Sequence, residues 1–289
     1  STQPDASSNQ SDKDASVALS FITSTANVNV GGSAVLTATG AVTVAAANTV
    51  TATTKADGGA GSSSGSAVGG TVAGTVIGGA TQTVIGGTAS LSGGSVVLSA
   101  ASTRTVDTQA KSTQGGATSG ATQTTGQQKL QQQDASTSDG SLQLAAAVAF
   151  TNISGDSAVL VSTGGALVSG GAITIDAGAA LAGPAGGVMT VADGSNTQAG
   201  SVGIGVGAAI NTANVASRVQ FSGATTLTAP GGVVAQATLS SAQFGAQATS
   251  GAGGSSVGVA GSLAINSGVT KAEAVLASTA DLTFTGNTA

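Results

Sequence analysis

Five stretches of the chain alternate aliphatic residues with very small ones. They lie at 16–21, 67–77, 141–150, 201–211 and 256–266. An alternation of period two is typical of an extended strand whose two faces differ. The stretch at 201–211, SVGIGVGAAIN, is the clearest, because its second face consists almost entirely of glycine. We therefore expect five long strands, each with one aliphatic face and one face of Gly, Ala, Ser or Thr.

Each long stretch is followed by shorter alternating runs that are separated by Gly-Gly or by Ser/Thr-Gly. The long stretches begin roughly 50 to 75 residues apart, a spacing that indicates repeats burying their apolar faces against one another. Asn-Gly and Asp-Gly hairpin pairs do not occur at the strand joints, which favours parallel coiling over a meander. The prediction is an all-β fold, a parallel β-solenoid with Gly/Ser/Gln-rich loop insertions.

The size of that solenoid follows from the coil length. Coils of about 20 residues give about ten to thirteen layers, and a spacing of about 4.8 Å makes a rod of about 50–60 Å. An array of immunoglobulin-like sandwiches is the alternative, but such domains usually need an anchoring Trp or Tyr, and the chain has neither.

The composition shifts along the chain divide it into four segments. A polar leading segment covers 1–15, and solenoid repeats cover 16–110 with a loop at 55–66. Residues 111–140 form a polar linker or insertion, and solenoid repeats resume at 141–289 and are expected to continue beyond the fragment. A shorter interruption is expected at 245–256.

The two faces of the long strands predict two sets of residues. Glycine in a strand packs nothing, so a recurring bare face suggests that another backbone comes close to it, either in the same chain or in a second copy. This close-packing face comprises Gly203, Gly205, Gly207, Ala145, Ala147, Gly258 and Ala260. The aliphatic face is expected to fill the solenoid core, with Val202, Ile204, Val206, Ile210, Leu142, Leu144, Val148, Val257 and Val259.

Charge and composition narrow the function. Charged residues are 7% of the 289 residues and the formal net charge is -5. The chain has no basic patch, so no nucleic-acid partner is expected, and no apolar run of about 18 residues predicts a membrane span. The lack of Cys fits either the cytosol or a bacterial secreted protein, and scarce Lys and Glu with abundant Thr, Ser and Gly favour an extracellular or cell-surface location.

Candidate chemistry is sparse. The absence of His and Cys excludes the usual catalytic triads and soft-metal sites, and we predict no enzyme activity, no catalytic residue and no cofactor. Asp176 is expected to be an outward or turn residue. Asp12 and Asp14 in SDKDAS are candidate oxygen ligands for Ca²⁺, and the Asp-Gly pairs at 57–58, 139–140 and 193–194 are turn residues first and Ca²⁺ ligands second. Asn211 and Asn266 each end a strand as AIN, which favours a left-handed turn over an asparagine ladder.

The stretch SVGIGVGAAINTANVASRVQFSGATTLTAPGGVVAQA resembles the repeats of giant secreted bacterial surface proteins, namely filamentous-haemagglutinin-like and autotransporter-type adhesins. The resemblance implies a right-handed β-helix, secretion, and a role in adhesion, aggregation or fibre formation. We therefore expect a non-enzymatic structural stalk or fibre-forming segment; a carbohydrate-binding or carbohydrate-active β-helix is the alternative. The expected partners are further repeats or copies, joined end to end and laterally, and a host or cell-surface ligand.

Overall fold

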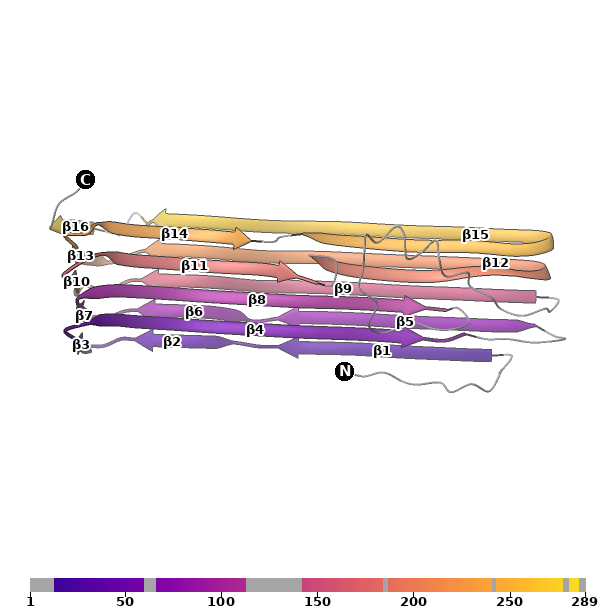
Figure 1. The fold of residues 1–289 in the computed structure, drawn as a ribbon, viewed down its shortest axis with the longest axis horizontal. Coiled ribbons are helices and arrows are strands. Elements are labelled where there is room, and N and C mark those ends of the chain that lie inside the picture. The colour runs from indigo at the N-terminus through magenta and orange to yellow at the C-terminus, as the bar shows by residue number, and fades with distance from the viewer. Residues whose placement is uncertain are drawn as a thin grey trace.

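A computed structural model describes residues 13–59, 66–112, 142–183, 187–240, 243–277 and 281–285. Within these ranges the chain is built of β-strands and their connections, with no helix. The strands pair in parallel in two sheets, and successive layers run from β1 to β15 across the molecule (Figure 1). The prediction of an all-β fold with parallel strands is confirmed. The antiparallel immunoglobulin-like alternative is wrong.

The strands repeat in a fixed order that defines a unit: a long first stretch, a short strand and a long return stretch. The first stretch is divided into two strands in units 1 and 2, and the return stretch is divided into two strands in unit 3. Unit 1 contains β1 (Lys13–Thr23), β2 (Ala26–Val30), β3 (Val35–Thr37) and β4 (Ala41–Asp57). Unit 2 contains β5 (Ala67–Gly78), β6 (Ala80–Ile85), β7 (Ser90–Gly93) and β8 (Ser95–Lys111). Unit 3 contains β9 (Leu142–Val161), β10 (Ala166–Ser169), β11 (Ile173–Ala182) and the start of β12 (Val188–Phe221).

The last two units share strands with their neighbours. Unit 4 contains the rest of β12, β13 (Ala224–Thr228), β14 (Val233–Ser240) and the start of β15 (Phe244–Leu276). Unit 5 contains the rest of β15 and β16 (Asp281–Thr285). The pairing of β12 with β15 shifts register at 196–202, where β12 passes from the return strand of one unit to the first strand of the next.

Equivalent strands of all units lie side by side and form three surfaces. The first wall consists of β1, β2, β5, β6, β9, residues 202–221 of β12 and residues 257–276 of β15. The return wall consists of β4, β8, β11, β14 and the starts of β12 and β15. The short strands β3, β7, β10, β13 and β16 form the second sheet, here called the corner, at one end of the long strands (Figure 1).

The predicted size of the repeat is wrong. One column of paired residues on the first wall runs Val17, Val72, Val148, Ala208, Leu263, so a layer takes about 55 to 75 residues rather than 20. The chain therefore makes five layers, about 24 Å at 4.8 Å each. The reason is that alternation continues without turn residues through long segments such as β4, which crosses the whole wall as one strand.

The interior between the walls narrows away from the corner. Near the corner it is filled by large aliphatic side chains, including Ile85, Leu91, Leu98 and Ile175. A second cluster around Ile77, Ile153 and Leu181 follows. The next cluster consists of alanine alone, from Ala18 and Ala56 to Ala209. Side-chain size sets the separation of packed sheets, so this gradient makes the cross-section a wedge.

Glycines occupy the narrow edge of the wedge. A Cβ on Gly203 would overlap the carbonyl oxygen of Gly253, and one on Gly205 would overlap that of Gly251. Gly207 faces the backbone of Thr249 in the same way. Ala145 and Ala147 are fully buried at the same edge. These glycines and alanines therefore lie where the close approach of another backbone was expected. Gly258 and Ala260 are exposed instead, because the described part of unit 5 has no return strand opposite them.

The expected solenoid core lies on the wrong face. Val206, Val257 and Val259 are 43%, 50% and 53% exposed, and Leu142 and Val148 are 39% and 38% exposed. Val202, Ile204, Ile210 and Leu144 are half-buried on the same outer face. At Gly203, Gly205 and Gly207 the backbone of the opposite wall occupies the space of a side chain, so the aliphatic residues between these glycines point outward.

Three segments expected as loops are strands. β4 continues to Asp57, into the predicted loop at 55–66, of which 60–65 lie outside the described residues. The predicted interruption at 245–256 belongs to β15, and the Asp-Gly pair at 193–194 belongs to β12. In each case the partner strand continues the ladder and overrides the local turn preference. Residues 1–12 and most of the linker, 113–140, lie outside the described residues.

A chain of buried hydroxyl groups joins the two walls through three units. Thr190 donates to Thr151, Thr151 to Thr108, and Thr108 to Thr75, with oxygen–oxygen distances of 2.7, 2.8 and 2.7 Å. Thr75 then donates to Thr54, which donates to Ser20. Each successive hydroxyl group lies on the opposite wall. The hydroxyl chain therefore supplies one polar group on each wall in each of these layers with a hydrogen-bond partner from the protein.

Gly205→Ala is expected to destabilise the protein by about 3 kcal/mol, because the added methyl group meets backbone that cannot move aside. Gly70→Ala is the matched control, since Gly70 lies on the outer face with nothing within 4 Å of an added Cβ. The control should leave stability unchanged or raise it by about 0.5 kcal/mol. Guanidinium unfolding followed by far-UV circular dichroism measures both, and equal effects would contradict the wedge.

Thr108→Val removes one link of the hydroxyl chain while keeping the side-chain shape. It should cost about 1–3 kcal/mol, because Thr151 loses its acceptor and Thr75 loses its donor inside the protein. Thr105→Val, on the outer face of the same strand, should change stability by less than about 0.5 kcal/mol. The same unfolding experiment compares the two variants. A Thr108 variant as stable as the Thr105 control would show that the hydroxyl chain contributes nothing to the free energy of unfolding.

Candidate functional surface

The outer face of the first wall carries a continuous apolar surface. It spans the columns from Leu142, Val202 and Val257 to Phe21 and Val76, and we call it the apolar face. Its most exposed members are Phe21 at 71%, Val17 at 60% and Leu263 at 54%. The outward residues within these columns are Val, Leu, Ile, Phe, Ala and Gly, except for Lys13 at the edge of β1. The polar residues Asn152, Thr212 and Ser267 form the boundary of the face.

Side chains of neighbouring units interlock on the apolar face. Leu19, Gly74, Phe150, Ile210 and Ile265 form one column in register. A Cβ on Gly74 would overlap the ring of Phe150 and lie 2.8 Å from the Leu19 side chain. The phenyl ring therefore lies over the glycine and fills the gap between two layers. This arrangement flattens the surface.

The outer face of the return wall is different. It is lined mainly by Thr, Ser and Ala with single Val residues such as Val234, and Thr49 lies beside Thr103 and Thr51 beside Thr105 in adjacent units. The molecule therefore has one apolar side and one polar side. Asp176 lies on the polar side, between Ser99 and Gln236, which is an outward position as expected.

Charged residues that are distant in sequence gather near the far end of the return wall. Asp57 and Asp193 occupy the positions in register with Lys111 in the two neighbouring layers. The Lys55 ammonium lies 3.6 Å from a carboxylate oxygen of Asp107. Burial lowers the pKa of Lys111, and the negative charges of Asp193 and Asp57 oppose part of that shift. Sequence reasoning missed this cluster because only the register of three units brings its members together.

The asparagines of the two AIN motifs are also brought together by register. Asn211 and Asn266 occupy the same inward column in adjacent layers, so the expectation that each ends a strand in a turn is wrong. Each side-chain amide donates to a backbone carbonyl of the return wall, Asn211 to Gly245 at 3.2 Å and Asn266 to Phe244 at 2.8 Å. They tie the walls together where the hydroxyl chain ends.

One cation is buried in the interior. Arg104 is 1% exposed and donates to the hydroxyl of Ser102 at 3.0 Å and to the carbonyl of Gly79 at 2.8 Å. Gly155 leaves room for the guanidinium, since any Cβ there would overlap it. Burial lowers the pKa of Arg104. The bond to Gly79 joins the return wall to the first wall, whereas the bond to Ser102 stays within β8.

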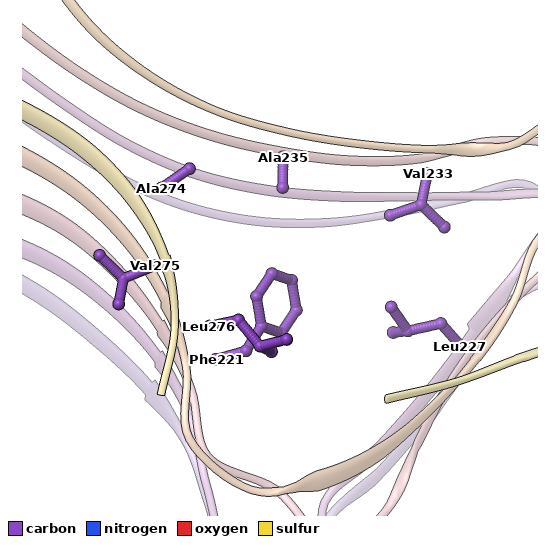
Figure 2. Close-up of a pocket in the computed structure, with 7 residues that line it drawn as sticks. All are labelled: Phe221, Leu227, Val233, Ala235, Ala274, Val275 and Leu276. Atoms are coloured by element: carbon purple, nitrogen blue, oxygen red, sulfur yellow. The ribbon is translucent and has the colours of Figure 1, made fainter. Parts of the chain in front are cut away.

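A pocket of about 260 Å³ opens at the end of the stack. Its lining is entirely apolar: Phe221, Leu227, Val233, Ala235, Ala274, Val275 and Leu276. Figure 2 shows Phe221, Leu227 and Val233 projecting into one space enclosed by the first wall, the corner and the return wall. The pocket is the wide part of the wedge, exposed where the described residues of unit 5 supply no return strand. It holds no polar side chain for chemistry.

The remaining candidate residues are separate from one another. Asp14 lies in β1, Asp57 and Asp193 lie in the charged cluster, and Asp12 and Asp139 lie outside the described residues. In the described ranges no group of three or more His, Cys, Asp or Glu side chains could hold a metal ion. The same ranges contain no helix that is long and apolar enough to cross a bilayer.

No protein-family model, no curated protein and no solved structure matches the chain. Its function therefore has to be argued from its own surfaces.

The stability of the protein should rise with pH above neutrality. Because the pKa of Lys111 is lowered in the folded state, the unfolded chain binds more protons between that lowered value and the ordinary value of 10.5. The free energy of unfolding should therefore increase through this range. The chain has no His, Cys or Tyr to obscure the effect. Lys111→Met should lose the increase, whereas Lys271→Met, at an exposed pair, should keep it.

Proposed function

We propose that this chain is a segment of a secreted bacterial surface protein in which a parallel β-solenoid acts as a stiff, non-enzymatic stalk. The observation that carries the proposal is the continuous register of the first wall through all five units, from β1 to β15. Stiffness along the stack comes from uninterrupted backbone ladders, because every layer hydrogen-bonds to the next along its whole length.

The interior supports a structural role. Aliphatic and alanine positions of the interior recur from layer to layer, and hydroxyl positions recur through the first three units, so that each of these layers repeats much of the packing of the previous one. Solenoids gain stability in this way from contacts between neighbouring repeats. An extracellular location fits the abundance of Thr, Ser and Gly. Adhesion would then belong to surfaces displayed by the stalk.

Electron cryo-microscopy of the native surface material, labelled with an antibody against this chain, tests the proposal. We expect elongated particles with layers about 4.8 Å apart along their axis and about 65 Å wide across the long strands. Label found only inside the cells, or on globular particles without this repeat, would contradict the stalk. Release of reducing ends from a panel of polysaccharides by the purified chain would instead favour the carbohydrate-active alternative.

A further inference from the structure

We propose that the apolar face binds the same face of a second copy of this chain, so that two copies pair laterally through their first walls. The pairing goes beyond the proposed stalk, which requires only contacts along the stack. It also involves the face opposite to the glycine face, since the glycines already pack inside the molecule.

The apolar face is large enough for a stable pair. Five strands about 4.8 Å apart and about ten residues at 3.3 Å cover about 800 Å². A specific interface uses about 800 Å² from each partner. Monomeric proteins rarely expose a continuous apolar surface larger than a few hundred Å², so this face is expected to be covered.

The spacing of the side chains favours a second copy as the partner. Rows on the apolar face repeat with the strand spacing, and only another stacked parallel sheet presents rows at the same interval over the whole area. The apolar face has no charged residue except Lys13 at the edge of β1. It therefore has no cluster of charges that could bind a charged partner.

A two-fold axis parallel to the strands of unit 3 fits the relief of the surface. It places each outward residue of β9 opposite its own copy, and unit 4 opposite unit 2 of the partner. Val206, which protrudes with 43% exposure, then faces Gly70, where nothing lies within 4 Å of an added Cβ. Val206 and Gly70 lie in the same column, one layer on either side of β9. The two-fold axis therefore places Val206 of each copy against Gly70 of the other.

Sedimentation equilibrium of the full chain and its variants tests the pairing. The unaltered chain should dimerise, and Val148→Lys or Val148→Glu should each raise the dissociation constant at least about 100-fold, because like charges meet at the axis. An equimolar mixture of the two variants should pair again. Val234→Lys is the matched control, because Val234 is 51% exposed on the return wall; it should dimerise normally. Circular dichroism melting confirms that each variant is folded.

Crosslinking gives a second readout. The chain has no cysteine, so Ala146→Cys introduces a single thiol at the proposed axis. Mild oxidation should yield a covalent dimer, whereas Ala47→Cys, on the outer face of β4, should not.

A chain that remains monomeric would overturn the lateral pair but leave the stalk intact, because the stalk is tested by the 4.8 Å repeat. Val148 variants that dimerise like the unaltered chain would also overturn it. So would binding of the monomer to neutral phosphatidylcholine vesicles that the Val148 variants lose, which would assign the face to a lipid surface.

Discussion

The separation of the two walls is set by the side chains between them, and most other features of the molecule depend on that separation. Large aliphatic groups such as Leu98 and Ile175 hold the walls apart beside the corner. Alanines let them converge, and at Gly203 and Gly205 the opposite backbone occupies the space of a side chain. Beside these glycines the branched residues of β12 therefore have room only on the outside, where they form part of the apolar face.

A column of polar groups between the walls forms hydrogen bonds within the protein. The hydroxyl chain from Thr190 to Ser20 occupies the level at which the interior changes from aliphatic to alanine. Asn211 and Asn266 continue that column by bonding to return-wall carbonyls. Because a displaced layer would break these bonds, the buried polar column opposes register slips that a uniformly apolar core would tolerate.

The difference between the two outer faces limits how copies can assemble. The return wall carries Thr49, Thr51, Thr103 and Thr105 on its outer face, and the charged cluster around Lys111 is largely buried at its far end. A pair formed through the apolar faces leaves these polar walls outside, so lateral association closes at two copies. Growth along the stack uses the strand edges, which is a separate surface. One chain can thus combine axial extension with a lateral contact of fixed number.

The sequence by itself indicated most of the strands, their parallel pairing and the five equivalent long stretches, because the period-two alternation and the glycine-rich joints that predict them are local properties. It also indicated that another backbone would approach Gly203, Gly205 and Gly207. It could not decide which face of SVGIGVGAAIN is buried, since Val206 and Gly205 are both apolar and alternation does not distinguish inside from outside when neither face is polar. It also could not give the layer length, or the meeting of Asp57, Lys111 and Asp193. Those were decided only by tertiary structure, because they depend on the distance between two walls and on the register of strands more than fifty residues apart.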